Sequence, residues 1–136
     1  GFYIGNVFAW SEGNNLTDGL PLETIVPVTN RLSFGYQGLN DRWLVSVAMV
    51  YTGRPRLSNE YQEAQPYYIP PSSLVFDLEA YWKISDSVSL NASINNLTNK
   101  AYFNYQDVRG LDNSNGDILR FSQPGRNFQV GIKFTF

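Results

Sequence analysis

The sequence contains neither cysteine nor histidine, and it has a single methionine. Without cysteine there are no disulfides, no thiolate metal sites and no cysteine nucleophile. Without histidine there is no Ser-His-Asp triad and no histidine ligand for zinc or haem iron. These 136 residues therefore contain none of those sites, and we expect no catalytic residue, no metal site and no enzyme activity in them.

Basic charge and long hydrophobic runs are also scarce. The net charge is −2, so the chain offers no basic surface, and we expect no nucleic-acid partner. No run approaches the roughly 18 apolar residues that a membrane helix needs. Neither an initiator methionine nor a secretory leader precedes the first strand-like segment, so we expect the chain to be part of a longer protein.

The last ten residues, NFQVGIKFTF, carry the strongest pattern in the sequence. Apolar side chains recur at every second position, which places them on one face of a strand and the polar residues on the other. A strand of about ten residues with this character suits a membrane β-barrel, with lipid outside and a lumen inside. The apolar set is similar to the C-terminal assembly signal of bacterial outer-membrane barrels: Phe128, Val130, Ile132, Phe134 and Phe136.

The same alternation predicts six strands of about eight to eleven residues. In the third, Trp43, Val47 and Tyr51 share the apolar face and Ser46 lies on the opposite one. The first is the least regular, because Asn6 interrupts its apolar series. No segment has helical periodicity. The predicted strands span residues 2–11, 30–37, 42–52, 74–83, 88–95 and 127–136.

Short and long connections alternate between these strands. Residues 38–41 (GLND) and 85–87 (SDS) form tight turns, whereas 12–29, 53–73 and 97–125 are long. This alternation of short and long connections is typical of outer-membrane barrels, which have short periplasmic turns and long extracellular loops. The alternative for such a strand pattern is a soluble all-β binding module. In such a module there is no reason for short and long connections to alternate.

Aromatic residues mark both ends of the predicted strands. Trp43 and Trp82 flank the short turns, while Trp10, Tyr51 and Phe128 lie near the long connections. Two aromatic girdles are expected where a barrel meets the two membrane surfaces. Six strands cannot close around a lumen, and an open sheet edge in hydrocarbon leaves backbone groups unpaired. The sequence therefore predicts an all-β fold, a transmembrane antiparallel β-barrel of which these strands are one part.

Several motifs resemble a known family. The motifs are GLPLETIVP (19–27), NNLTNKAY (95–102), DVRG (107–110) and QPGRNF (123–128). They resemble the C-terminal end of TonB-dependent outer-membrane receptors, and most closely those of the haem and haemoglobin branch. The resemblance implies that residues 1–136 are the last six strands of a 22-stranded barrel in the bacterial outer membrane. It also implies that the plug and the TonB box lie outside this sequence.

A function is implied by the same resemblance. Receptors of this family import an iron-containing ligand, using energy that the inner-membrane TonB complex delivers through the plug. Here the implied ligand is haem or a haem protein, transported rather than held as a cofactor; the further partners are outer-membrane lipid, lipopolysaccharide and the barrel assembly machinery. Tyr102, Phe103 and Tyr105 are the candidate ligand contacts. A siderophore or other chelate as ligand, or a passive porin or adhesin-type barrel, remains an alternative.

The asparagines of NNLTNKAY have a structural interpretation. Asn95, Asn96 and Asn99 tolerate turn geometry and bind nearby backbone groups, so we expect them to end a strand. Pro124 and Gly125 form a turn before the last strand.

The acidic residues also have structural interpretations. The stretch DNSNGD (112–117) lacks the full spacing and the closing glutamate of a calcium-binding EF-hand, so loop polarity explains it. Asp77 and Glu79 lie two apart and share the lumen face with Lys83. We expect these to be charges on a barrel wall and not a catalytic carboxylate pair.

Overall fold

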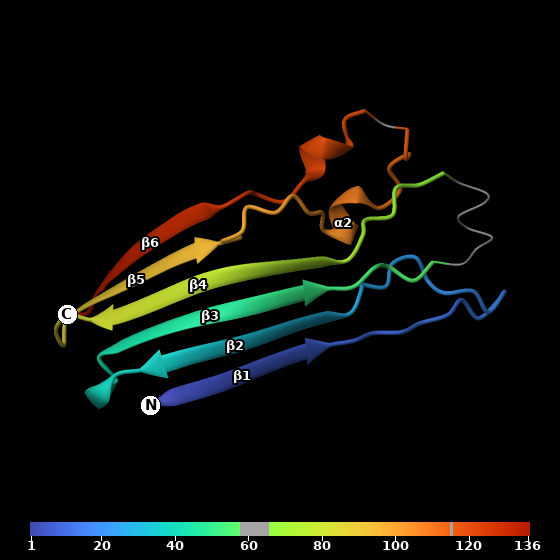
Figure 1. The fold of residues 1–136 in the computed structure, drawn as a ribbon. Helices are drawn as coiled ribbons and strands as arrows, with labels where there is room; N and C mark the ends of the chain where they lie inside the picture. Colours follow the sequence, from blue (N-terminus) through green and yellow to red (C-terminus); the bar gives the residue numbers. More distant parts are fainter. Residues whose placement is uncertain (58–65, 115) are drawn as a thin grey trace.

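The fold is a single antiparallel sheet of six strands, seen in a computed structural model that describes residues 1–57, 66–114 and 116–136. The strands lie in the sheet in the order in which they occur in the sequence (Figure 1). Their bounds are Phe2–Ala9 (β1), Thr29–Gln37 (β2), Trp43–Thr52 (β3), Ser73–Lys83 (β4), Val88–Asn95 (β5) and Asn127–Phe134 (β6).

The short turns lie at one end of the sheet, together with both chain termini, and the long connections lie at the other end (Figure 1). We call the long connections loop A (10–28), loop B (53–72) and loop C (96–126). The predicted strands and the alternation of short and long connections are confirmed. The first and the last strand end at Ala9 and Phe134, two residues earlier than predicted.

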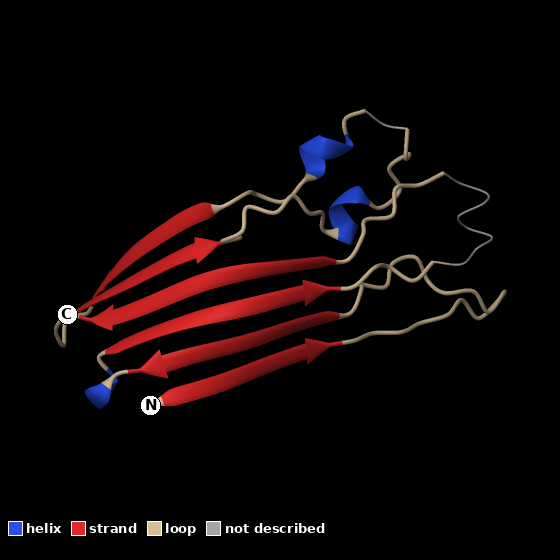
Figure 2. Ribbon diagram, in the orientation of Figure 1, coloured by secondary structure: helices blue, strands red, loops and turns tan. Residues whose placement is uncertain are grey.

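Short helical segments occur within the connections (Figure 2). Two are 3₁₀ turns, η1 (Leu39–Asp41) and η2 (Ile118–Phe121), and one is a single α-helical turn, α2 (Tyr105–Val108). The side chain of Asn104 caps α2 by accepting a hydrogen bond from the Gln106 amide. One turn is too short to show a helical period, which is why the pattern predicted none. Within the three described ranges, no helix is long and apolar enough to cross a membrane.

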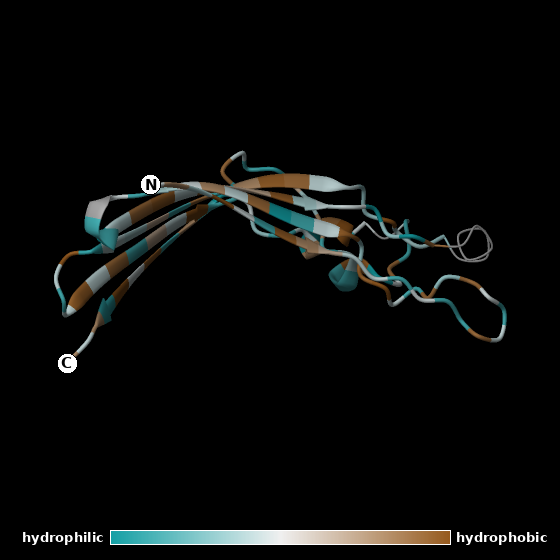
Figure 3. Cartoon of the chain, turned by 90° about the horizontal axis from the view of Figure 1, so that it is seen from below, coloured by the Kyte–Doolittle hydropathy of each residue, from teal (hydrophilic) through white to brown (hydrophobic). Residues whose placement is uncertain are grey.

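Strand register gathers the alternating residues into continuous rows across the sheet. One apolar row runs through directly paired residues of β2 to β6: Phe34, Val47, Leu78, Ile94 and Phe128. The neighbouring row on the other face is small or polar: Gly35, Ser46, Glu79, Ser93 and Gln129. Directly paired residues share a face, so the sheet has one apolar and one polar face. The resulting colour bands are visible along the strands in Figure 3.

The apolar face is uncovered. Val130, Ile132 and Phe134 are 73%, 60% and 60% exposed, and neighbouring strands show the same trend. Exposed apolar area of this extent costs about 25 cal/mol per Å² in water, so this face requires apolar surroundings.

Aromatic rings form a band at the short-turn end of the apolar face. Trp43 pairs directly with Trp82 across β3 and β4. The ring of Tyr36 lies 4.8 Å from that of Phe2 and 5.4 Å from that of Trp43, measured between centroids. A Cβ atom at Gly38 would lie 2.2 Å from the Trp43 indole nitrogen, so the absence of a side chain at Gly38 lets the indole lie over the turn. The predicted aromatic band at this end is confirmed.

Asn6, which interrupts the apolar series of β1, has a partner on the same face. Its Nδ2 donates to Oδ1 of Asn30 at 3.1 Å, and Asn30 Nδ2 donates back to Asn6 Oδ1 at 3.4 Å. Each amide thus satisfies part of the other's hydrogen-bonding capacity, which lowers the cost of placing both among apolar side chains.

Candidate functional site

The polar face carries an ion cluster on β2 and β4. The Arg31 guanidinium lies 3.1 Å from a carboxylate oxygen of Asp77 and also pairs with Glu79. The Asp77 side chain is 14% exposed and that of Arg31 35% exposed, so water screens the pair only in part. Asp77 and Glu79 do face the same side, as the sequence predicted, but their cation comes from β2.

Lys83, the cation that the sequence placed beside these carboxylates, instead pairs with Asp86 in the β4–β5 turn at 2.8 Å. The hydrogen bond and the positive charge of Lys83 lower the pKa of the Asp86 carboxyl below its ordinary value. The pair is an exposed contact within one turn, so its contribution to stability is small.

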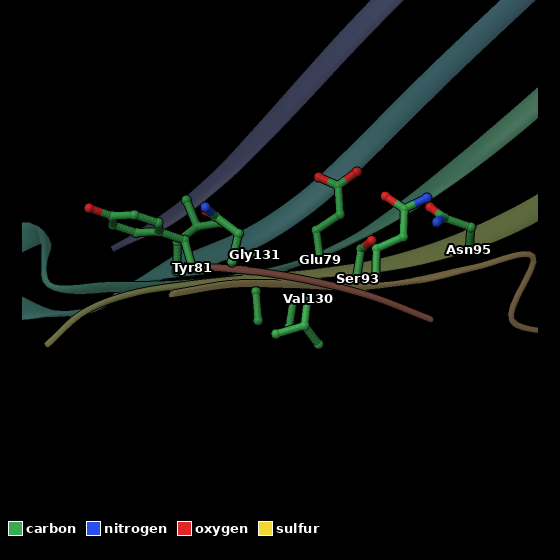
Figure 4. A pocket seen from close by; sticks show the side chains of 11 residues that line it. Glu79, Tyr81, Ser93, Asn95, Val130 and Gly131 are labelled. Carbon is green, nitrogen blue, oxygen red and sulfur yellow. The ribbon is translucent and has the colours of Figure 1, made fainter. Parts of the chain in front are cut away.

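A shallow hollow of about 510 Å³ lies beside this cluster, over β4, β5 and β6. Glu79, Ser93 and Asn95 project to one side of the sheet there, and Val130 projects to the other (Figure 4). Its polar lining is rich in amide and hydroxyl groups, which bind water or backbone groups without adding net charge. Gly131 also lines the hollow, and a Cβ atom there would meet nothing within 4 Å.

Loop C contacts loop B through backbone pairing. The Tyr68 amide donates to the Leu111 carbonyl at 2.8 Å, and the Asn113 amide donates to the Pro66 carbonyl at 2.7 Å. The rings of Tyr68 and Phe103 meet edge to face, with centroids 5.3 Å apart. Residues 66–68 of loop B and residues 103–113 of loop C therefore pack together at the long-loop end of the sheet.

Loop C also contacts loop A, through α2. The Tyr105 side chain is buried, 3% exposed, and its hydroxyl donates to the Glu23 carbonyl at 2.7 Å. Gln106 Nε2 donates to the neighbouring Thr24 carbonyl at 3.3 Å. Burial raises the pKa of the Tyr105 hydroxyl, which stays protonated and able to donate at neutral pH. We call loops A, B and C together the loop layer.

The base of loop C is built by Asn96, which is 2% exposed. Its Nδ2 donates to the carbonyls of Lys100 and Pro124 at 2.8 and 3.2 Å, and its Oδ1 accepts from the Lys100 amide at 2.8 Å. Asn96 and Asn99 have φ angles of 52° and 53°, a region in which asparagine is favoured over most residues. The structural role predicted for the asparagines of NNLTNKAY is confirmed for Asn96 and Asn99, whereas Asn95 donates to the Asn127 side chain at 3.0 Å and not to backbone.

The three predicted ligand contacts have different surroundings. Tyr102 is half-buried, and burial together with the negative charge of Asp77 raises the pKa of its hydroxyl. Phe103 packs on Tyr68, and Tyr105 is buried between loops A and C. Ligand contact at these positions stays a prediction. In the described part of the chain, no group of three or more His, Cys, Asp and Glu residues is placed to hold a metal ion.

A family model described as TonB dependent receptor-like, beta-barrel matches residues 2–97 of this chain. The chain belongs to the TonB-dependent receptor β-barrel family. Members of this family lie in the bacterial outer membrane, so the strands are transmembrane and the apolar face meets lipid. The polar face is then the lumen face, and the loop layer lies on the extracellular side.

Curated relatives within this receptor family carry haemoglobin in their names. The chain is 28% identical to hemoglobin-haptoglobin utilization protein B of Neisseria meningitidis serogroup A / serotype 4A over 133 residues, which cover 85% of this chain and 16% of that protein. It is 25% identical to the hemoglobin and hemoglobin-haptoglobin-binding protein of Haemophilus ducreyi, over 85% of this chain and 14% of that protein. The chain thus spans less than a fifth of the length of either relative.

Solved structures of two other proteins share the fold. The copper transporter OprC superposes with a TM-score of 0.81 at 19% identity, over 99% of this chain and 21% of that chain. The ferric enterobactin receptor of Pseudomonas aeruginosa superposes with a TM-score of 0.70 at 20% identity, over 100% of this chain and 20% of that chain.

Sequence reasoning missed two features of the site. It did not connect Arg31 with Asp77, although both alternate onto the lumen face, because the partner of a charge depends on strand register. It also missed the contacts of Tyr105 with loop A, because 82 residues separate Tyr105 from Glu23 and no periodicity relates them.

Proposed function

We propose that this chain is the C-terminal segment, six of 22 strands, of a TonB-dependent receptor that imports haem or haem from a haem protein. The observation that carries the proposal is the 28% identity with a haemoglobin-haptoglobin utilization protein over 85% of this chain. Such a segment has two roles, as barrel wall and as extracellular ligand surface. The alternating apolar and polar side chains of the strands fit the first role, and the loop layer fits the second.

The first role is that of barrel wall. The strands present apolar side chains to lipid and amides, hydroxyls and the Arg31 cluster to the lumen, where the proposed plug would sit. The second role is that of extracellular ligand surface. Three long connections pack together at one end of the sheet, which gives a protein ligand a broad, partly pre-organised surface. Energy for import would reach the receptor through a TonB box and plug outside these residues.

The test uses the full-length receptor. Purified in detergent, it should bind haemoglobin or free haem with at least tenfold higher affinity than a ferric siderophore. Cells that carry it should take up haem iron only when TonB is present. If the receptor bound a ferric chelate in preference to haem and haemoglobin, haem would be wrong as the proposed ligand and a siderophore would take its place. Uptake without TonB would support a passive barrel and overturn the proposal.

Siderophore or other chelate import remains the second candidate. It is favoured by the structural likeness to the ferric enterobactin receptor, but at 20% identity that likeness extends to the fold alone.

A further inference from the structure

Asp77 lies where the lumen wall meets the base of loop C. One carboxylate oxygen, Oδ2, is 3.1 Å from the Arg31 guanidinium, and the other, Oδ1, accepts the Asn96 amide hydrogen at 3.0 Å. Asn96 is the first residue after β5, so its amide opens loop C. One side chain therefore binds both a charge on the lumen wall and the first backbone donor of an extracellular loop.

The backbone of Asn96 explains why the loop requires this acceptor. Leu78 is paired with Ile94, so continuing the β4–β5 ladder by two residues would bring Asn96 opposite Phe76. The positive φ of Asn96, 52°, ends regular pairing there, and the Phe76 carbonyl accepts from Leu97 at 2.7 Å instead. The buried Asn96 amide would be left without an acceptor, and the Asp77 carboxylate supplies one. A bond to a charged acceptor is stronger than one to a neutral carbonyl.

From Asn96 the contacts extend through the loop layer. Its side chain binds the carbonyls of Lys100 and Pro124, which lie near the two ends of loop C, and so closes the loop at its base. Beyond that base, α2 binds loop A through Tyr105, and residues 111–113 bind loop B. The position of loop C thus affects both of its neighbours.

We propose that Asp77 is a positioning residue for the extracellular ligand surface: by holding the Asn96 amide, it fixes the base of loop C and with it the loop layer. Arg31 orients the carboxylate from the lumen side. The part of this inference that concerns ligand affinity rests on the proposed function, whereas the part that concerns loop order does not.

The test compares three variants of the full-length receptor in intact cells. Asp77→Ala removes both acceptors, Asp77→Asn keeps an oxygen for Asn96 but loses the charge, and Glu79→Gln weakens only the neighbouring ion pair. External trypsin reports loop order, because loop C contains Lys100 and Arg109, whose side chains are exposed and whose backbone must open before cleavage. Heat-dependent gel mobility reports whether the barrel has folded.

Asp77→Ala should fold and be cleaved at Lys100 about tenfold faster than the wild type, because a buried amide loses its acceptor. Asp77→Asn should be accelerated less, by about threefold, because its amide oxygen still accepts from the Asn96 amide although the bond has lost the contribution of the charge. Glu79→Gln should stay within about twofold. The affinity for haemoglobin should fall about tenfold in Asp77→Ala alone. Unchanged cleavage in folded Asp77→Ala, or equal acceleration in Asp77→Asn, would overturn the proposal.

A measurement on the wild type covers the case in which Asp77→Ala does not fold. Hydrogen exchange of the peptide that spans residues 94–101 should be as slow as that of β4 peptides. Exchange at the rate of an open loop would overturn the proposal. Cleavage and exchange need no ligand, so a receptor that binds no haem protein would refute the proposed function and leave this test intact.

Discussion

At the scale of single residues, Gly125 shows how little space the start of β6 allows. A Cβ atom there would lie 2.6 Å from Oδ1 of Asn99, the same oxygen that accepts the Arg126 amide at 2.8 Å. Asn99 cannot keep this bond and also make room for a methyl group. The contact joins the two ends of loop C, so the glycine matters for the whole connection.

We therefore expect Gly125→Ala in the full-length receptor to destabilise the fold by about 0.5–1.5 kcal/mol, the net contribution of one exposed hydrogen bond. Gly131→Ala is the matched control, because its new methyl group would meet nothing within 4 Å. Urea titration in detergent measures both. Equal stability of the two variants would contradict the interpretation of Asn99.

Tyr105 should make the loop layer sensitive to alkaline pH. Its hydroxyl is ordinarily ionised around pH 10.0, and burial raises its pKa in the folded loops. A raised pKa means that the folded state holds the proton more tightly than the unfolded chain does. The stabilisation is thus complete below pH 10.0 and is lost as the pH rises through the raised value.

Cleavage of loop C by an alkali-stable protease measures this effect. The wild type should resist cleavage better than Tyr105→Phe at pH 8, because the variant cannot donate to the Glu23 carbonyl. Above the raised pKa the difference should disappear. A difference that persists at all pH values would show that the hydroxyl bond is not its cause.

Tyr102 and Tyr105 also allow a test of haem coordination. Both lie on the extracellular side, but Tyr105 is buried and bonded, and burial raises the pKa of both hydroxyls, which disfavours the tyrosinate form that binds iron. We expect Tyr102→Phe and Tyr105→Phe to weaken haem-protein binding modestly, and the absorption spectrum of bound haem to keep its axial-ligand signature. Loss of that signature in either variant would place part of the iron site in this segment.

At the scale of the strand, the assignment of faces is open to a charge test. Val130→Arg places a cation on the lipid face of β6, where it costs about 2–4 kcal/mol near the midplane. Gln129→Arg, one residue earlier, points into the lumen and should cost less than about 1 kcal/mol. Folding efficiency into liposomes measures both, and equal losses would mean that the faces are wrongly assigned.

The strands also show what the sequence was able to predict. Alternation at period two placed Val47 and Ser46 on the correct faces, because a pleated strand permits no other arrangement. It did not reveal that Ser46 is 3% exposed, crowded among the neighbouring strands. Ser46 lies on the lumen face, but an arginine at this buried position would have to displace its neighbours. Ser46→Arg would therefore not serve as a lumen-facing control for the charge test. Burial on a face depends on neighbours in the sheet, and a local pattern does not contain them.

Loop contacts were less accessible to prediction than strands. The asparagines of NNLTNKAY were correctly assigned to a strand end, because their chemistry acts on nearby backbone. Tyr105 was predicted as a ligand contact because it lies close to Tyr102 and Phe103 in the last long loop, and that contact stays a prediction. The sequence did not reveal that the ring is buried against loop A. Nothing in the adjacent sequence specifies which loop will cover a given ring.

At the scale of the whole molecule, six strands form an open sheet with two unpaired edges and an uncovered apolar face. Isolated from the rest of the receptor, the segment should aggregate in plain buffer or require detergent, because both features promote association. Analytical ultracentrifugation of the expressed segment is the check. A monodisperse monomer that unfolds cooperatively without detergent would contradict the membrane assignment.

The separation of short turns from long loops has a thermodynamic consequence. Closing a flexible loop costs conformational entropy that grows only with the logarithm of its length, about 0.6 kcal/mol for each doubling. Loops A, B and C can therefore lengthen or shorten substantially at little expense to the pairing of the strands beneath them. The turns at the opposite end have no such freedom, since five or fewer residues must reverse the chain in fixed geometry. A change in the length of an extracellular loop therefore costs little folding free energy. A change in the length of a turn on the side that faces the cell interior costs much more.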